Sequence, residues 1–195
     1  MNDNKKIDKK FYEKTLRPDR QRSYKIVCDT LVKEFSPKSV VDFGCGAGWI
    51  LHYFNKLNVT DLKGLEICKD SKLIASEDIN EKISFMSLSE NIDLGRQFDL
   101  TVSFEVAEHI DEIYADVIVK NLCRHSKIVV FSAAYPGQGG YGHINEQEFS
   151  YWRQKFEKED FLWDETISSK IKSNWKKKNI SMWYWKNTNI FRKEI

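Results

Sequence analysis

The apolar positions of this chain follow two spacings, one typical of helices and one typical of buried strands. Between residues 19 and 35 they recur every three or four positions, which predicts a helix that ends at Ser36-Pro37. Short apolar runs predict strands at 39–43, 62–67, 83–86, 98–104 and 127–132. The intervening segments predict helices at 49–57, 71–79 and 107–122. The last of these carries an apolar stripe of Ile110, Ile113, Tyr114, Val117, Ile118 and Leu122.

Strands and helices therefore alternate over about 100 residues, the pattern of right-handed βαβ units. We predict an α/β fold with a doubly wound, mostly parallel sheet and helices on both faces. Beyond this region we predict helices at 146–156 and 164–175 and an edge strand at 189–193. The chain is divided into an N-terminal helical extension, residues 1–37, and one compact domain, residues 38–195.

Composition narrows the class of protein. The 195 residues are 41% hydrophobic, which is enough to build a core, and the net charge of +2 gives no reason to expect a nucleic acid as partner. No apolar run approaches the roughly 18 residues of a membrane span, and the first residues lack the apolar segment of a secretory signal. We expect a cytosolic protein that does not contact a membrane. A lysine cluster near the C-terminus is interpreted as a solvated face: Lys170, Lys172, Lys176, Lys177 and Lys178.

The cysteines and histidines show no metal-binding spacing. The four cysteines form no Cys-x-x-Cys pair, and Cys123 with His125 has no second pair to complete a site. We therefore expect free thiols and no metal ion.

A glycine-rich loop, residues 42–48, follows the first predicted strand directly. Glycines at 44, 46 and 48 let the backbone turn sharply and approach a ligand, and the next helix offers unpaired N–H groups. The loop departs from the dinucleotide pattern G-x-G-x-x-G because Trp49 occupies the sixth position. It also lacks the Lys of a phosphate loop. An ordinary tight turn is the remaining alternative.

Glu66 ends the second predicted strand, about 20 residues after the loop. At that distance an acidic side chain accepts hydrogen bonds from ribose hydroxyls. Glu66 by itself is also consistent with a solvent-facing strand end. Together with the glycine loop it indicates a bound nucleoside.

These segments resemble the successive motifs of the class I S-adenosylmethionine-dependent methyltransferases. The residues that carry the resemblance are 41–48, 64–67 and 98–110. Later segments are similar to a subgroup of small-molecule or sugar methyltransferases: 131–140, 142–147 and 183–187. The resemblance implies a seven-stranded sheet with an antiparallel last strand. It also implies S-adenosylmethionine as cofactor and S-adenosylhomocysteine as product.

The resemblance assigns cofactor contacts residue by residue. The methionine part would lie at Asp42, Gly44, Cys45, Gly46 and Gly48. Glu66 would hold the ribose hydroxyls, Ile67 would lie against the adenine, and Ser87-Leu88 would lie near the adenine edge. Glu105 would lie beside the methionine part or the reacting centre, where it is also a candidate catalytic residue.

Methyl transfer requires chiefly that a nucleophile is placed in line with the sulfonium, and a hydroxyl nucleophile benefits from a base. His143 is the candidate base, because its ordinary pKa is near neutrality and it follows the fifth predicted strand. Glu146 is a candidate to orient His143 or to bind substrate hydroxyls. Glu108 and His109 form a second candidate acid/base pair.

The acceptor side has two further candidates. Tyr141 and His109 are predicted to contact the acceptor, although packing at a helix start is an alternative for His109. The segment 136–142 holds four glycines and is interpreted as a mobile lid, with a plain surface loop as the alternative.

Three functions remain open at this stage. The first is O-methylation of a hydroxyl on a small molecule, with a sugar or glycan as the leading acceptor. The second is methylation of a nucleic acid or protein, suggested by the lysine cluster. The third is a non-catalytic module that binds the cofactor.

Overall fold

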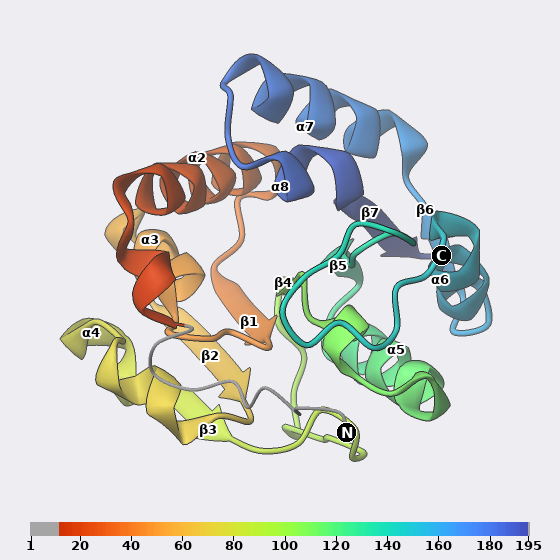
Figure 1. Ribbon diagram of the computed structural model, residues 1–195, viewed down its shortest axis with the longest axis horizontal. Coiled ribbons are helices and arrows are strands. Elements are labelled where there is room, and N and C mark those ends of the chain that lie inside the picture. Colours follow the sequence, from red (N-terminus) through yellow and green to blue (C-terminus); the bar gives the residue numbers. More distant parts are fainter. Residues whose placement is uncertain (1–11, 195) are drawn as a thin grey trace.

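The fold is built on one seven-stranded sheet, seen in a computed structural model that describes residues 12–194 (Figure 1). The strand order is β3-β2-β1-β4-β5-β7-β6. The first five strands are parallel, and β7 runs antiparallel to both β5 and β6. This confirms the predicted doubly wound α/β fold. The strands are β1 Ser39–Phe43, β2 Asp61–Glu66, β3 Ile83–Phe85, β4 Leu100–Phe104, β5 Ile128–Ser132, β6 Phe161–Trp163 and β7 Asn189–Lys193.

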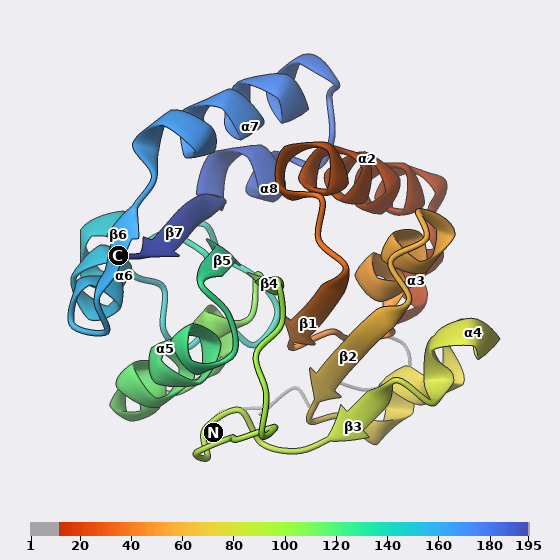
Figure 2. The ribbon, with the colours of Figure 1, turned by 180° about the vertical axis from the view of Figure 1, so that it is seen from behind.

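Helices cover both faces of the sheet. Figures 1 and 2 show α2, α3 and α7 on one side and α5 and α6 on the other. The α-helices are α2 Pro18–Phe35, α3 Trp49–Lys56, α4 Glu77–Asn80, α5 Ala115–Arg124, α6 Phe149–Glu157, α7 Glu165–Lys177 and α8 Met182–Asn187. Short 3-10 turns are η1 Lys14–Leu16, η2 Lys69–Leu73, η3 Ala107–His109 and η4 Glu112–Tyr114. No helix in the described part of the chain is long and apolar enough to cross a membrane.

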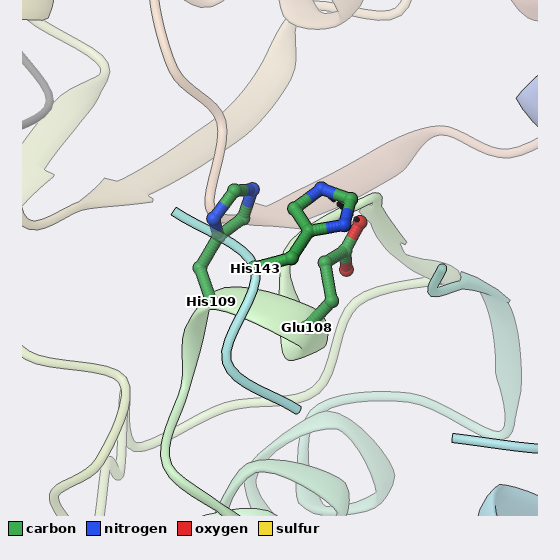
Figure 3. Close-up of side chains that lie close together, drawn as sticks. All are labelled: Glu108, His109 and His143. Atoms are coloured by element: carbon green, nitrogen blue, oxygen red, sulfur yellow. Dashed lines mark ion pairs between the residues drawn. The ribbon is translucent and has the colours of Figure 1, made fainter. Parts of the chain in front are cut away.

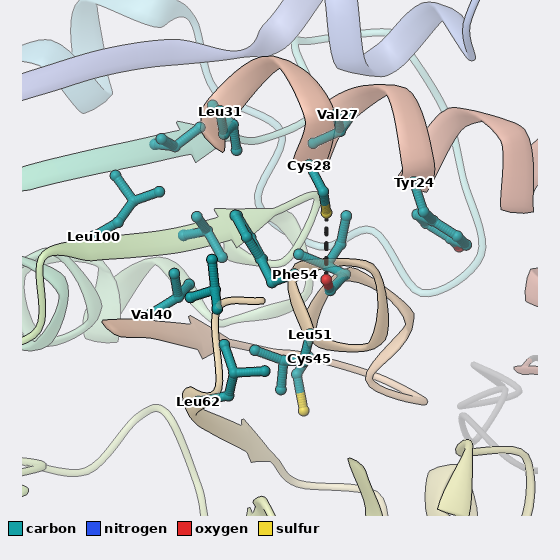
Figure 4. Packing of buried hydrophobic residues seen from close by; sticks show 14 of the residues in the cluster. Tyr24, Val27, Cys28, Leu31, Val40, Cys45, Leu51, Phe54, Leu62 and Leu100 are labelled. Atoms are coloured by element: carbon teal, nitrogen blue, oxygen red, sulfur yellow. Dashed lines mark hydrogen bonds between the residues drawn. The ribbon is translucent and has the colours of Figure 1, made fainter. Parts of the chain in front are cut away.

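The strands divide their side chains between two cores because successive residues point to opposite faces. Val40 packs with helices α2, α3 and α7, whereas its neighbour Val41 packs with α5 and α6. Figure 4 shows the first core, where Leu31 of α2 and Phe54 of α3 are fully buried. The Cys28 thiol donates to the Ile50 carbonyl at 3.3 Å, which joins the two helices.

The helix predicted at 107–122 is wrong in its first half. Residues 107–114 form two 3-10 turns, and the α-helix begins only at Ala115. The break has a local cause: Ile110 is extended, and the Asp111 carboxylate accepts the Ile113 N–H at 3.1 Å as a cap. Ile113 is consequently 74% exposed rather than part of an apolar stripe.

Two other predictions need correction. The segment 71–79 forms no continuous helix, since η2 and the four-residue α4 divide it. The strand 189–193 exists but is internal, because β6 pairs with its outer edge. β6 has only three residues and was not predicted. The described part of the predicted N-terminal extension contains η1 and α2, and residues 1–11 lie outside the described residues.

Candidate active site

The glycine loop has the left-handed backbone that the sequence suggested. Gly44, Gly46 and Gly48 have φ values of 79°, 54° and 72°. A Cβ on Gly44 would lie 2.4 Å from Val106, and one on Gly48 would lie 2.6 Å from Ile79. The loop is also tied to β2, because the N–H groups of residues 44 and 45 donate to one backbone carbonyl. Two of the glycines are therefore needed for packing, and the loop is held in one shape.

A cavity of about 450 Å³ lies beside this loop. It opens where the parallel strands β1, β2 and β4 end, the position at which open α/β sheets bind ligands. From the loop, the cavity is lined by Asp42, Gly44, Cys45 and Gly46. From the other predicted contacts, it is lined by Glu66, Ile67, Ser87, Leu88, Glu105 and His109. Gly48 is the predicted cofactor residue that does not line it.

Glu66 is buried and held in place by backbone N–H groups. Its Oε1 accepts from Ile67 N at 2.8 Å and Cys68 N at 2.9 Å, and its Oε2 accepts from Gly46 N at 2.8 Å. The Tyr12 hydroxyl donates to Oε1 at 3.2 Å. The carboxylate is thus oriented and lies at the cavity wall, as a ribose-binding group requires. Burial, followed by the charge of Glu66, raises the pKa of the Tyr12 phenol.

The cavity wall concentrates acidic groups near the loop. Asp42 is 3% exposed, and burial together with the charge of Glu66 raises its pKa to about 8. Glu105 lies across the cavity mouth from it on the segment after β4, and burial raises its pKa as well. Such buried acids suit a ligand that carries positive charge, as the ammonium and sulfonium groups of S-adenosylmethionine do.

Glu105 joins three segments. Its backbone is left-handed, with φ 55°, which is rare outside glycine and is found at functional sites. Its carboxylate accepts from Gln138 Nε2 at 3.0 Å and from Asn187 Nδ2 at 3.1 Å. Asn187 also donates to Gln138 Oε1 at 2.8 Å. The end of β4, the loop after β5 and the end of α8 therefore meet at this side chain.

A second cluster lies beside the cavity and contains both predicted acid/base pairs; Figure 3 shows Glu108, His109 and His143 of this cluster. His143 Nδ1 is 2.7 Å from Glu146 Oε1, and His143 Nε2 is 3.9 Å from Glu108 Oε1. The His109 ring lies edge-on to the His143 ring at 4.9 Å, and its Nδ1 is 3.1 Å from the Gly142 carbonyl. Only His109 of these five residues lines the cavity.

The site therefore differs in arrangement from the sequence expectation. His143, Glu146 and the acceptor candidate Tyr141 do not line the cavity, and His143 lies behind His109. Burial, followed by the charge of Glu105, raises the pKa of Glu108 well above its usual range. The pKa of His109 is lowered chiefly by burial, which keeps its ring neutral near pH 7. The hydrogen bond from His143 lowers the pKa of Glu146.

The glycine-rich segment 136–142 wraps around Glu146. The N–H groups of Gly137 and Gly139 each donate to its carboxylate at 2.8 Å. A Cβ on Gly140 would lie 2.2 Å from His143 Nε2, so a side chain there is incompatible with this ring position. These glycines shape the cluster, and their mobility as a lid stays a prediction.

Several lining residues were not predicted as site residues. Five come from the N-terminal segment and α2, outside the recognised motifs: Tyr12, Lys14, Thr15, Arg20 and Tyr24. Trp183 and Tyr184 of α8 belong to the segment 183–187 that resembles the methyltransferase subgroup, but no role was assigned to them. Tyr24 was assigned only to an apolar helix stripe. The Arg20 guanidinium lies 4.2 Å from the centre of the Trp183 ring, which brings α2 and α8 together at the cavity.

The lysine cluster is engaged within the protein only in part. Lys170 pairs with Glu34 at 2.7 Å, and Lys172 is partly buried and donates to Asn189 at 2.9 Å. Burial lowers the pKa of Lys172. Lys176, Lys177 and Lys178 are exposed, in agreement with the interpretation as a solvated face.

Comparisons with known proteins agree with the fold and identify the family. A family model described as a methyltransferase domain matches residues 17–176. The ubiquinone biosynthesis O-methyltransferase of Dictyostelium discoideum is 32% identical over 88 residues, which cover 37% of this chain and 27% of that protein. The ubiquinone biosynthesis O-methyltransferase of Rickettsia bellii is 28% identical over 83 residues, which cover 41% of this chain and 35% of that protein. The chain therefore spans only about a third of the length of these relatives.

Solved structures share the whole fold at low identity. The sugar N-methyltransferase KedS8 from Streptoalloteichus superimposes with a TM-score of 0.71 and 11% identity, covering 97% of this chain and 94% of that one. The magnesium protoporphyrin IX methyltransferase from Synechocystis, with bound S-adenosylhomocysteine, superimposes with a TM-score of 0.65 and 16% identity. The match covers 97% of this chain and 89% of that one. Since the family model matches more than half of the chain, the protein belongs to the class I methyltransferases, which use S-adenosylmethionine.

Proposed function

We propose that this methyltransferase transfers the methyl group to a hydroxyl of a small molecule, with a sugar or glycan hydroxyl as the leading acceptor. The observation that carries the proposal is His109 at the cavity wall, where one side-chain atom from each of Glu108, His109 and His143 lies within 4.8 Å of the other two. A hydroxyl acceptor must lose a proton, and this cluster supplies groups that accept one. The partial match to ubiquinone biosynthesis O-methyltransferases supports an oxygen acceptor.

The cofactor residues keep the roles given by the resemblance. Glu66 holds the ribose hydroxyls, Ile67 and the Ser87-Leu88 turn contact the adenine, and the glycine loop with Asp42 surrounds the methionine part. S-adenosylmethionine, when bound, supplies an electrophilic methyl group. The protein's own task is to align the acceptor and to exclude water.

With the cofactor held by the glycine loop, Asp42 and Glu66, the acceptor oxygen would take the methyl group, and the electron pair of the broken carbon–sulfur bond would stay on sulfur. The acceptor proton passes to the cluster. His109 is nearest to the cavity, and its Nδ1 donates to the Gly142 carbonyl, which leaves Nε2 as the acceptor of a proton. His143, held by Glu146, supports the position of this ring. Aromatic side chains of the wall, such as Trp183 and Tyr184, would pack against a ring-shaped acceptor.

The test is transfer of a labelled methyl group to a panel of sugars and phenols by wild type, His109→Gln and His143→Ala. We expect turnover to fall by about 100-fold in each variant, the scale of lost acid–base catalysis. S-adenosylhomocysteine affinity should stay at the wild-type value, which shows that the fold and cofactor site are intact.

Other results would argue against the proposal. Undiminished turnover in both variants would remove the cluster from the reaction. Methylation confined to RNA or protein, lost at high salt, would favour the second alternative. Cofactor binding without transfer to any acceptor would favour a non-catalytic module. A cytosolic location stays a prediction from the sequence.

A further inference from the structure

Glu108 is the most unusual polar side chain among the described residues. It is fully buried, and neither carboxylate oxygen has a hydrogen-bond partner in the described part of the chain. Burying a carboxylate without a partner is costly, so such groups usually pair with a cation or a metal ion. The nearest cationic candidate that the structure gives Glu108 is His143, whose Nε2 lies 3.9 Å from Glu108 Oε1, beyond hydrogen-bond distance. A cation between these groups would satisfy the buried carboxylate.

Two imidazoles lie beside this carboxylate. One ligand atom each from Glu108, His109 and His143 can be chosen so that all three atoms lie within 4.8 Å of one another. Figure 3 shows the three side chains gathered at one place, two from the turn η3 and one from the loop after β5. In a tetrahedral site with bonds of about 2.1 Å, ligand atoms are roughly 3.4 Å apart. Small side-chain rotations would bring these atoms to that separation.

The hydrogen bonds of His109 and His143 engage Nδ1 of each ring, so Nε2 of each ring is available to bind a metal ion. His109 Nδ1 faces the Gly142 carbonyl, which can only accept, so Nδ1 carries the proton. His143 Nδ1 faces the Glu146 carboxylate at 2.7 Å and carries a proton for the same reason. In each neutral ring the lone pair is therefore on Nε2. Metal-binding histidines are typically held in this way, with the second nitrogen donating to a carbonyl or carboxylate.

The backbone keeps the ligand-bearing segments together. The N–H groups of Ile144 and Asn145 donate to the Glu108 carbonyl at 2.9 and 3.0 Å. The loop that carries His143 is thus fastened to the turn that carries the other two side chains.

We propose that Glu108, His109 and His143 form a binding site for one divalent transition-metal ion of the Zn²⁺ type. Two imidazole nitrogens and one carboxylate suit such an ion better than Mg²⁺ or Ca²⁺, which prefer oxygen ligands. Three protein ligands leave a coordination position open, as in catalytic zinc sites. The sequence analysis predicts no metal ion, because Glu108 and His109 are adjacent, His143 lies on a distant segment, and the three show no metal-ligand spacing.

The open position would lie on the cavity side, where His109 forms the wall. The site depends only on the geometry above, but its role rests on the proposed O-methyltransferase function. A cation there would bind the acceptor hydroxyl and lower its pKa. His109 Nε2 has a single lone pair and cannot both bind the ion and accept a proton. In the metal-loaded enzyme His109 would therefore bind the ion and would not accept the proton. The ion would promote loss of the hydroxyl proton by lowering the pKa of the hydroxyl, and the proton would pass to water.

The experiment measures binding of Zn²⁺ and Co²⁺ to the chelator-treated full chain by calorimetry, with visible absorption of Co²⁺ as a second readout. We expect one ion per chain in the wild type. Glu108→Gln and His143→Ala should weaken binding by at least about 100-fold, and Glu146→Gln, which removes only a supporting contact, by about tenfold. His52→Ala is the matched control, since His52 pairs with Asp78 on the surface and should not affect binding.

S-adenosylhomocysteine affinity, measured on the same samples, reports whether each variant is folded. Absence of stoichiometric binding by the wild type would overturn the proposal, as would equal affinity in the wild type and the two ligand variants. Bound metal without any hydroxyl methylation would refute the proposed function and leave the site standing. Hydroxyl methylation that continues unchanged in excess chelator would refute the role of the ion but not the proposed function.

Discussion

Asp42 shows how one buried side chain can make stability depend on pH. Its folded-state pKa of about 8 lies above the value of about 3.9 for an unfolded aspartate. Between these values the folded state holds a proton that the unfolded state releases, so the free energy of unfolding falls as pH rises. The slope is at most about 1.4 kcal/mol per pH unit for one group.

We therefore predict that Asp42→Asn flattens this dependence in the cofactor-free protein. The variant should exceed the wild type in stability at pH 8, and the difference should shrink toward pH 5. Urea unfolding at pH 5, 6.5 and 8 measures the effect. Asp70→Asn makes the same chemical change at an exposed position and should leave the slope as it is. Parallel curves for wild type and Asp42→Asn would contradict the assignment.

At the scale of elements, α2 is the helix that the sequence prediction placed outside the compact domain. It was assigned to an extension before the domain, yet its residues Tyr24, Val27 and Leu31 are buried in the core shared with α3 and α7. Its N-terminal end carries Arg20 and contributes to the cavity wall. We propose that α2 is part of the structural unit that forms the active site.

Leu31→Ala tests this at a fully buried position of α2. Loss of a buried leucine leaves a cavity, and we expect the free energy of unfolding to fall by about 3 kcal/mol. Chemical denaturation measures it. Lys25→Ala, on the exposed face of the same helix, should change stability by less than about 0.5 kcal/mol. Equal effects of the two substitutions would show that α2 does not contribute to the core.

For the molecule as a whole, the sequence predicted those features that depend on the pattern of neighbouring residues. The parallel strands, the glycine loop and Glu66 each carry a signal within a few residues, and all are found in the expected positions. The position of β6 outside β7 has no such signal, because pairing between distant strands decides it. The turn at 107–114 was missed because a helical apolar spacing hid the capping role of Asp111.

The predicted cofactor contacts, apart from Gly48, line one cavity, whereas the acceptor candidate Tyr141 and the candidate base His143 do not. The predicted cofactor contacts follow the strands in sequence order. The acceptor side joins η3, the loop after β5 and α8, and contacts such as Asn187 with Glu105 appear only in three dimensions. Glu108 has no hydrogen-bond partner for its carboxylate among the described residues, and this depends on its surroundings in three dimensions, which residue spacing does not indicate.

Tyr12 has a consequence for how spent cofactor leaves. Its hydroxyl occupies Glu66, the proposed ribose-binding carboxylate, and a Cβ on Gly46 would lie 3.3 Å from its ring. The nucleoside and this phenol therefore compete for one carboxylate. Tyr12→Phe keeps the ring and removes the competitor, so S-adenosylhomocysteine should bind about three- to tenfold more tightly, the scale of one hydrogen bond. Titration of both proteins measures this, and equal affinities would rule out the competition.

In a working cell the by-product accumulates as methyl groups are consumed. When S-adenosylhomocysteine leaves, the Tyr12 hydroxyl again donates to Glu66. This competition shortens the time for which S-adenosylhomocysteine stays bound and limits inhibition by it. Tyr12 would then sustain turnover by favouring release of S-adenosylhomocysteine. Tyr12→Phe would lose activity as S-adenosylhomocysteine accumulates, under conditions in which the wild-type enzyme stays active.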